Sequence, residues 1–101
     1  MKRKVLIPKT AEKKLDKLFD YLLNEWSKKV KNEFIEKLNN SIEIIRTQPV
    51  IFPESKKGKN LRRCTITKQT TLYYRFNSKH IYIVTLFDTR QDPGRLKSDI
   101  L

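Results

Sequence analysis

The chain of 101 residues has few of the residues from which small metal and cofactor sites are built. It contains one cysteine, one histidine and two glycines. A single cysteine excludes an internal disulfide, and we expect Cys64 to be a small buried side chain in a reducing compartment. No group of cysteines, histidines and carboxylates has metal-ligand spacing, and there is no glycine-rich phosphate loop. We therefore expect no metal and no other cofactor.

Long hydrophobic runs are absent too. The run Val5-Leu6-Ile7 is too short for a signal-peptide core or a membrane span, so we expect a cytoplasmic protein with no membrane partner. Acidic residues are scarce: 11 stand against 23 lysines and arginines, a formal net charge of +12. Such an excess favours polyanionic partners, although a solubilising lysine coat is the simpler explanation of the charge.

The C-terminal half of the sequence predicts a sheet. Three short β-rich runs cover residues 62–68, 70–76 and 81–87, separated by a few turn-prone residues, which indicates a three-stranded antiparallel meander. In the second run, Leu72, Tyr74 and Phe76 share one face, and Tyr73 and Arg75 share the other. The third run is apolar on both faces, which is typical of a central strand, and its alternation places Ile83 and Leu86 on opposite faces.

The N-terminal half predicts helices. A short strand at 5–7 precedes a helix that we expect to begin at Ala11 with Thr10 as its cap, and its apolar stripe extends to Trp26. Ser27 is expected to cap a second helix that Pro49 ends. These two helices must bury their stripes together. The fold class is therefore α+β in a single domain, residues 1–101: an N-terminal strand and a helical hairpin packed on one face of a small, mainly antiparallel sheet.

The other face of this sheet is the predicted functional surface. Arginine forks bind phosphate or carboxylate with two hydrogen bonds, and exposed tyrosine rings stack on bases. An RNA backbone and an acidic peptide would both suit such a surface. The candidate target- or anion-binding residues, drawn from segments expected to converge, are Arg62, Arg63, Tyr73, Arg75, Arg90, Lys56, Lys57 and Lys59.

Catalysis has less support in the sequence. Cleavage of RNA through its 2′-hydroxyl needs a proton acceptor and a donor as well as cations. His80 is expected in a solvated turn, and Asp88 and Asp92 in a local ion-pair or turn-capping set with Arg90 rather than as a general base. No catalytic set is assigned; Arg62 and Arg90 are the candidates if the protein is an enzyme.

These residues together resemble the RelE/ParE superfamily of bacterial type II toxins, over nearly the whole chain. The resemblance is carried by the order of elements, Leu61-Arg62-Arg63, the strand Leu72-Tyr73-Tyr74-Arg75, and the closing stretch from Ile83 to Pro93. It implies a small basic cytoplasmic toxin with a cognate antitoxin, whose C-terminal segment wraps the toxin and masks its active surface.

The resemblance leaves the target open between two branches. RelE-like members cleave mRNA on the ribosome, and Arg62 and Arg90 match two of their basic positions. Thr71 and Leu96 stand where those nucleases have an arginine and a tyrosine. This departure favours the ParE-like branch, whose members bind DNA gyrase, although Asp88 occupies a position where ParE-like members often have histidine. A ribosome-dependent endoribonuclease is the alternative, and a non-toxic nucleic-acid-binding module is the second alternative.

Overall fold

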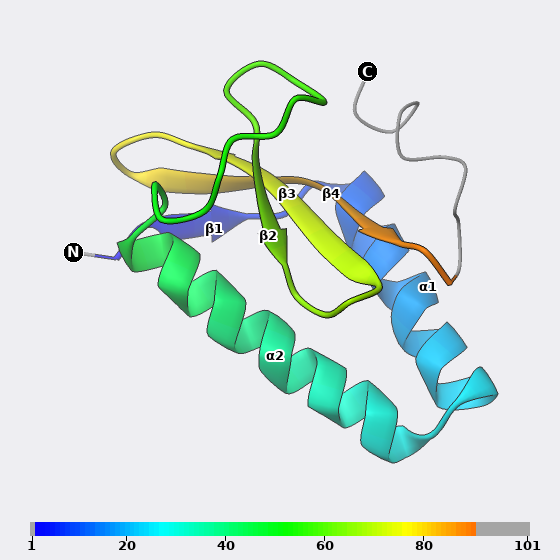
Figure 1. Cartoon of the computed structure of the whole chain (residues 1–101). Coiled ribbons are helices and arrows are strands. Elements are labelled where there is room, and N and C mark those ends of the chain that lie inside the picture. The colour runs from blue at the N-terminus through cyan, green and yellow to red at the C-terminus, as the bar shows by residue number, and fades with distance from the viewer. Residues whose placement is uncertain (1, 91–101) are drawn as a thin grey trace.

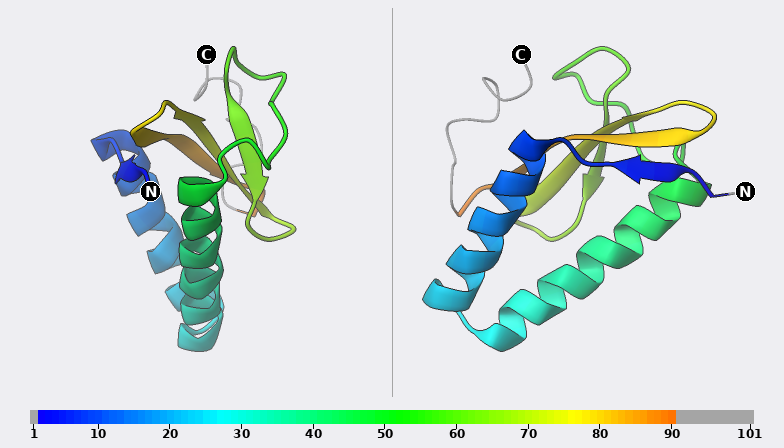
Figure 2. Two further views of the ribbon diagram at one scale, coloured as in Figure 1. Left: turned by 90° about the vertical axis from the view of Figure 1, so that its left-hand side faces the viewer. Right: turned by 180° about the vertical axis from the view of Figure 1, so that it is seen from behind.

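The computed structural model describes residues 2–90, in which two helices pack against one side of a four-stranded sheet (Figures 1 and 2). Among these residues, no helix combines the length and the apolar character that crossing a membrane requires. The elements follow in the order β1 (Lys4–Leu6), α1 (Lys9–Glu25), α2 (Lys28–Thr47), β2 (Arg62–Thr65), β3 (Thr70–Phe76) and β4 (His80–Asp88).

The sheet has the strand order β1-β4-β3-β2. The strands β2, β3 and β4 form the predicted antiparallel meander, and β1 joins β4 in parallel. Consecutive strands can pair antiparallel through a short turn, whereas a parallel pair needs a long connection. Here both helices and the strands β2 and β3 lie between β1 and β4 in the sequence. The predicted α+β fold is confirmed, and β4 is the central strand that its two apolar faces indicated.

The core lies between the helices and the sheet. The apolar stripes of α1 and α2 meet the inward-facing side chains of the strands because neither helix alone can remove its stripe from water. Leu18, Leu22 and Ile45 of the helices are fully buried, as are Leu72 and Tyr74 of β3. The fully buried phenol of Tyr74 donates a hydrogen bond to the Pro49 carbonyl oxygen at 2.6 Å. This bond ties the end of the helical hairpin to the middle of the sheet.

A β-bulge corrects the predicted faces of β4. The register changes between Tyr73, which pairs with Thr85, and Tyr74, which pairs with Ile83, so Val84 is the extra residue. A bulge moves every later side chain to the opposite face. Leu86 consequently packs in the core with Ile83, whereas the strict alternation of the sequence had placed the two on opposite faces.

The helix termini agree with the sequence in one case and differ in two. The Ser27 hydroxyl accepts a hydrogen bond from the Val30 amide at 3.1 Å, which confirms the predicted cap of α2. The predicted cap at Thr10 is wrong, because α1 begins at Lys9 after Pro8 and has no side-chain cap. Trp26 was expected in the buried stripe, but it follows the last residue of α1, where the chain turns, and is 56% exposed.

Smaller differences concern the ends of the strands. β2 ends at Thr65 rather than at Lys68, because residues 66–69 form the tight turn into β3. β4 begins one residue earlier than predicted, so that His80 pairs with Lys4 of β1 instead of lying in a turn. The predictions for Asp92 and for Leu96 lie outside the described residues.

Candidate anion-binding site

The segment between α2 and β2, residues 48–61, folds back along β2 and forms one wall of the site. We call it the connector. Its Ser55 amide donates to the Leu61 carbonyl oxygen at 2.7 Å, and the Arg63 amide donates to the Pro53 carbonyl oxygen at 3.1 Å. Between Ser55 and Leu61 the chain reverses direction. Asn60 has a left-handed backbone conformation there (φ 55°), which asparagine tolerates better than most residues. The connector is therefore a defined wall rather than an unattached loop.

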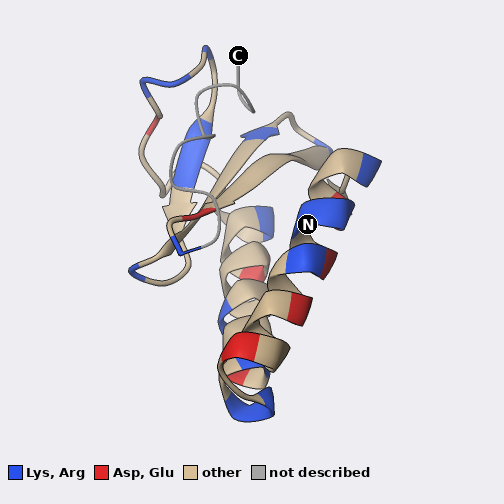
Figure 3. Cartoon of the chain, turned by 90° about the vertical axis from the view of Figure 1, so that its right-hand side faces the viewer, with Lys and Arg blue, Asp and Glu red and all other residues tan. Residues whose placement is uncertain are grey.

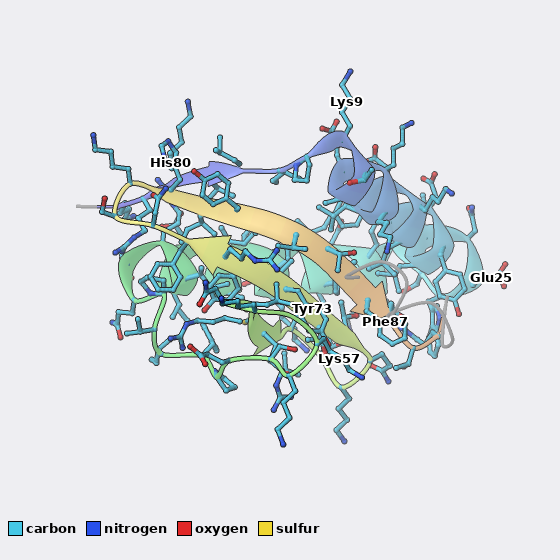
Figure 4. The ribbon with its side chains drawn as sticks, turned by 90° about the horizontal axis from the view of Figure 1, so that it is seen from above. Lys9, Glu25, Lys57, Tyr73, His80 and Phe87 are labelled. Atoms are coloured by element: carbon cyan, nitrogen blue, oxygen red, sulfur yellow. The ribbon has the colours of Figure 1, made fainter. Side chains whose placement is uncertain are left out.

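A cleft of about 390 Å³ lies between the connector and the sheet face turned away from the helices, which we call the outer face. Arg63 and Tyr73 are direct cross-strand partners on this face. Figure 4 shows the connector passing beside Tyr73, with Lys57 close to it. The cleft is lined by Glu54, Ser55, Lys56, Lys57, Arg63 and Tyr73.

Tyr73 has a different environment from the one expected. The residue is only 5% exposed, so its ring is not the open platform for base stacking that the sequence suggested. Burial raises the pKa of the Tyr73 phenol above its ordinary value, and the neighbouring charge of Arg63 opposes that rise. The hydroxyl therefore stays protonated at neutral pH and is a hydrogen-bond donor facing the cleft.

Arg75 and Lys59 flank this cleft. Arg75 lies two residues beyond Tyr73 on the same face, and its Nε donates to the Lys59 carbonyl oxygen at 3.2 Å. Arg75 is half-buried, and this hydrogen bond lies in an exposed environment. Six of the eight predicted binding residues are thus brought together around the connector: Lys56, Lys57, Lys59, Arg63, Tyr73 and Arg75.

Arg62 does not belong to this group. It pairs with Tyr74 and therefore faces the other side of the sheet. Its guanidinium donates to the Phe52 carbonyl oxygen at 2.7 Å, lies 3.6 Å from the carboxylate of Glu54 and stacks 5.7 Å from the Phe76 ring centre. Arg62 holds the connector against the sheet rather than presenting a free cation.

Arg90 lies at a separate place, beside the turn between the two helices. Its guanidinium makes a two-pronged ion pair with Asp88, at 2.8 Å and 3.1 Å, and lies 5.7 Å from the Trp26 ring centre. Asp88 also accepts from the Thr70 hydroxyl. Burial would raise the pKa of Asp88, but these hydrogen bonds outweigh burial and lower it. The sequence suggested a local Asp88–Arg90 pair; the contact with Trp26 was missed.

The predicted candidates for catalysis are dispersed. Arg62 and Arg90 lie on different parts of the molecule, as described above. His80, the single histidine, opens β4 and stacks against Tyr82, with ring centres 5.8 Å apart. Figure 4 shows it at the opposite end of β4 from Phe87. Within residues 2–90 the cleft itself has no histidine. The cleft combines the cations of Lys56, Lys57 and Arg63 with the phenol of Tyr73, and this chemistry suits the binding of an anion.

The charge distribution supports this reading. Figure 3 shows mainly lysines and arginines on the connector and β2, where Glu54 is the acidic residue, whereas the helices carry many charges of both signs. Exposed cations grouped on one face attract anionic partners over about 10 Å at ordinary ionic strength. The basic surface is thus concentrated on the part of the molecule that the helices leave uncovered.

Comparisons with known proteins agree with the resemblance seen in the sequence. A family model described as "ParE toxin of type II toxin-antitoxin system, parDE" matches residues 5–93. A search of curated proteins finds no match. The matched stretch covers both described helices and, apart from Lys4 at the start of β1, all four described strands. The chain therefore belongs to the ParE toxin family of type II toxin–antitoxin systems.

Proposed function

We propose that this protein inhibits growth by binding DNA gyrase and that the C-terminal segment of a cognate antitoxin neutralises it. The observation that carries the proposal is the family match over residues 5–93. Membership of the family implies an antitoxin partner. The proposal goes further in naming gyrase as the target and in having the antitoxin wrap the toxin. Because gyrase acts on the chromosome, the proposal also implies a cytoplasmic protein.

The chemistry of the cleft supports binding rather than cleavage. Activation of a 2′-hydroxyl is most efficient with a proton acceptor whose pKa lies near the operating pH. Tyr73 is a poor acceptor because burial raises its pKa, and Glu54 is directed towards Arg62 at 3.6 Å. The described cleft therefore supplies three cations, and Glu54, the carboxylate in its described lining, is engaged by Arg62. A target-binding surface that includes Arg63, Arg75, Lys56, Lys57 and Lys59 fits a toxin that acts by binding.

Regulated expression with two parallel readouts tests this proposal. We expect growth arrest with double-strand DNA breaks and intact transcripts, and we expect purified protein to inhibit supercoiling by gyrase. Transcripts cut within translated codons would instead support the ribosome-dependent nuclease. Nucleic-acid binding without growth arrest would support the non-toxic binding module.

The antitoxin half of the proposal has its own test. A peptide with the sequence of the C-terminal segment of the adjacent antitoxin gene product should restore supercoiling in the purified assay. A scrambled peptide of the same composition is the matched control, because it keeps the net charge. Equal relief by both peptides would contradict specific wrapping and indicate simple charge neutralisation.

A further inference from the structure

We propose that the cleft under the connector binds a phosphate monoester, such as the terminal phosphate of a nucleotide. This inference goes beyond the proposed function, because neither gyrase nor an antitoxin is needed for it. It rests on three independent features of the described cleft: its charge, an unused hydroxyl on the mostly buried Tyr73, and its size.

The charge of the cleft matches a dianion. Lys56, Lys57 and Arg63 contribute three positive charges and Glu54 one negative charge, which leaves two positive charges. The Glu54 carboxylate also lies 3.6 Å from the guanidinium of Arg62, which further offsets its effect on a ligand. A phosphate monoester carries between one and a half and two negative charges near pH 7, since its second pKa is about 6. A single carboxylate would leave the site with an excess of positive charge.

The hydroxyl of Tyr73 provides the second observation. The side chain is 95% buried, at 5% relative exposure, and its hydroxyl makes no hydrogen bond within residues 2–90. By contrast, the adjacent Tyr74 hydroxyl is satisfied by the Pro49 carbonyl oxygen at 2.6 Å. No enclosed side-chain oxygen or nitrogen in the described part of the chain lacks a partner, so the Tyr73 hydroxyl must be reached from the cleft that it lines. A buried phenol left open towards three cations is suited to donate to an anionic oxygen.

The donors differ in the geometry that they offer. Arg63 stands on β2 as the cross-strand partner of Tyr73, and both line the cleft, where the charge of Arg63 acts on the phenol. Lys56 and Lys57 reach from the opposite wall as flexible single charges. The Ser55 hydroxyl holds that wall in shape by accepting from the Lys57 amide at 3.1 Å. The phosphate would therefore lie between a rigid strand and an adjustable connector.

The size of the cleft indicates more than a bare ion. A volume of about 390 Å³ falls within the usual range for small-molecule sites, roughly 300–1,000 Å³. It leaves room for part of a sugar beyond the phosphate. The same terminal phosphate can come from a free nucleotide or from the 5′ end of a nucleic-acid strand.

Calorimetric titration of the complete chain tests the proposal, with adenosine 5′-monophosphate as the probe and adenosine as the control for the phosphate. We expect adenosine 5′-monophosphate to bind and adenosine not to bind. The Tyr73→Phe variant should weaken binding about tenfold or more, because it removes one hydrogen bond to a charged group. Tyr82→Phe, the same change at an exposed tyrosine outside the cleft, should leave binding within about twofold.

A second pair of variants separates the cleft from the general basic surface. Arg63→Gln should weaken binding more than Arg75→Gln, although both remove one positive charge from the same sheet face. Two oligonucleotides of one sequence, with and without a 5′-phosphate, separate the sources of the phosphate. Tighter binding of the phosphorylated strand would extend the site to strand ends, whereas a preference for the mononucleotide alone would define a nucleotide site.

The proposal would be overturned by any of three results. The first is that adenosine 5′-monophosphate binds no better than adenosine. The second is that Tyr73→Phe and Arg63→Gln bind like the unmodified chain. The third is that Arg75→Gln loses as much binding as Arg63→Gln, which would indicate a diffuse field. Circular dichroism confirms that each variant is folded, and Tyr73→Phe should fold normally because the lost hydroxyl has no bond within the described chain.

Discussion

The helical half and the sheet half of this molecule differ in how they use charge. The helices, residues 9–47, carry nine lysines and arginines and seven acidic residues, so their surface is nearly balanced. The connector and meander, residues 48–90, also carry nine cations but only Glu54 and Asp88 as acids. Both acids in this second half are engaged with arginines. This uneven distribution supports the proposal that the sheet half, rather than the helices, binds an anionic partner.

The first prediction concerns the stabilising role of the helices and has the largest expected effect. Leu18→Ala should lower the free energy of unfolding by about 2–5 kcal/mol, because this fully buried side chain leaves a cavity between α1 and the sheet. Leu23→Ala is the matched control on the same helix, since Leu23 is 43% exposed. Urea unfolding measures both changes. Equal losses at the two positions would contradict the assignment of the buried stripe.

The second prediction concerns the Asp88–Arg90 pair, a charged site that we assign to stability. Asp88→Asn should cost about 2–3 kcal/mol at neutral pH, because the buried carboxylate loses its charge-assisted bonds from Arg90 and Thr70. Asp20→Asn, at an exposed position of α1, should change stability by less than about 0.5 kcal/mol. Denaturant titration compares the two variants.

The pH dependence of Asp88→Asn follows from the lowered pKa of Asp88. A carboxyl whose pKa is lower in the folded state contributes stability above the ordinary value of about 3.9 and loses that contribution as pH falls through the folded value. The gap in stability between the unmodified chain and Asp88→Asn should therefore narrow below about pH 4. A gap that stays constant down to pH 2 would show that the charge of Asp88 is not the cause.

The third prediction uses two adjacent tyrosines on opposite faces. Tyr74→Phe should cost about 1–2 kcal/mol, because the Pro49 carbonyl oxygen loses its donor in the core. Tyr73→Phe should have almost no effect on stability, since its hydroxyl makes no bond within the described chain. Thermal unfolding of the two variants is the measurement. A larger loss for Tyr73→Phe would mean that its hydroxyl is structural and would weaken the case for a ligand in the cleft.

A fourth effect, the smallest, concerns the junction between the helices. Ser27→Ala should cost about 1 kcal/mol through loss of the bond to the Val30 amide. Thr10→Ala should cost much less, because α1 has no side-chain cap. Urea unfolding measures the loss of stability in each variant. Equal losses would contradict the assigned start of α1.

Much of the fold could be predicted from periodicity, and the failures have identifiable causes. Leu72, Tyr74 and Phe76 alternate with polar residues, so the inward face of β3 could be assigned. The run 81–87 is apolar at almost every position, so no polar side chain marks the bulge at Val84. Trp26 continues the spacing of the α1 stripe, but the helix ends at Glu25 and the indole leaves the core. Periodicity describes regular elements and does not report where they end.

The candidate site could be predicted only in part for a related reason. The alternation of β2 and β3 placed Arg63, Tyr73 and Arg75 on one face, as observed. The burial of Tyr73 depends on how the connector folds over the sheet, and that path is determined by tertiary hydrogen bonds such as the one from Ser55 to Leu61. The sequence grouped Arg62 and Arg90 with the other cations because of their charge. In the structure Arg62 instead contacts Phe52 and Glu54 of the connector, and Arg90 contacts Asp88.

The measurement that tests the comparison of the two halves most directly is inhibition of gyrase supercoiling by matched charge variants. The double variant Arg63→Gln/Arg75→Gln removes two cations from the outer sheet face, and Lys28→Gln/Lys29→Gln removes two exposed cations from α2. We predict at least a tenfold loss of inhibition for the first variant and less than a twofold change for the second. Equal losses, or full inhibition by the sheet variant, would contradict the assignment of function to the sheet half.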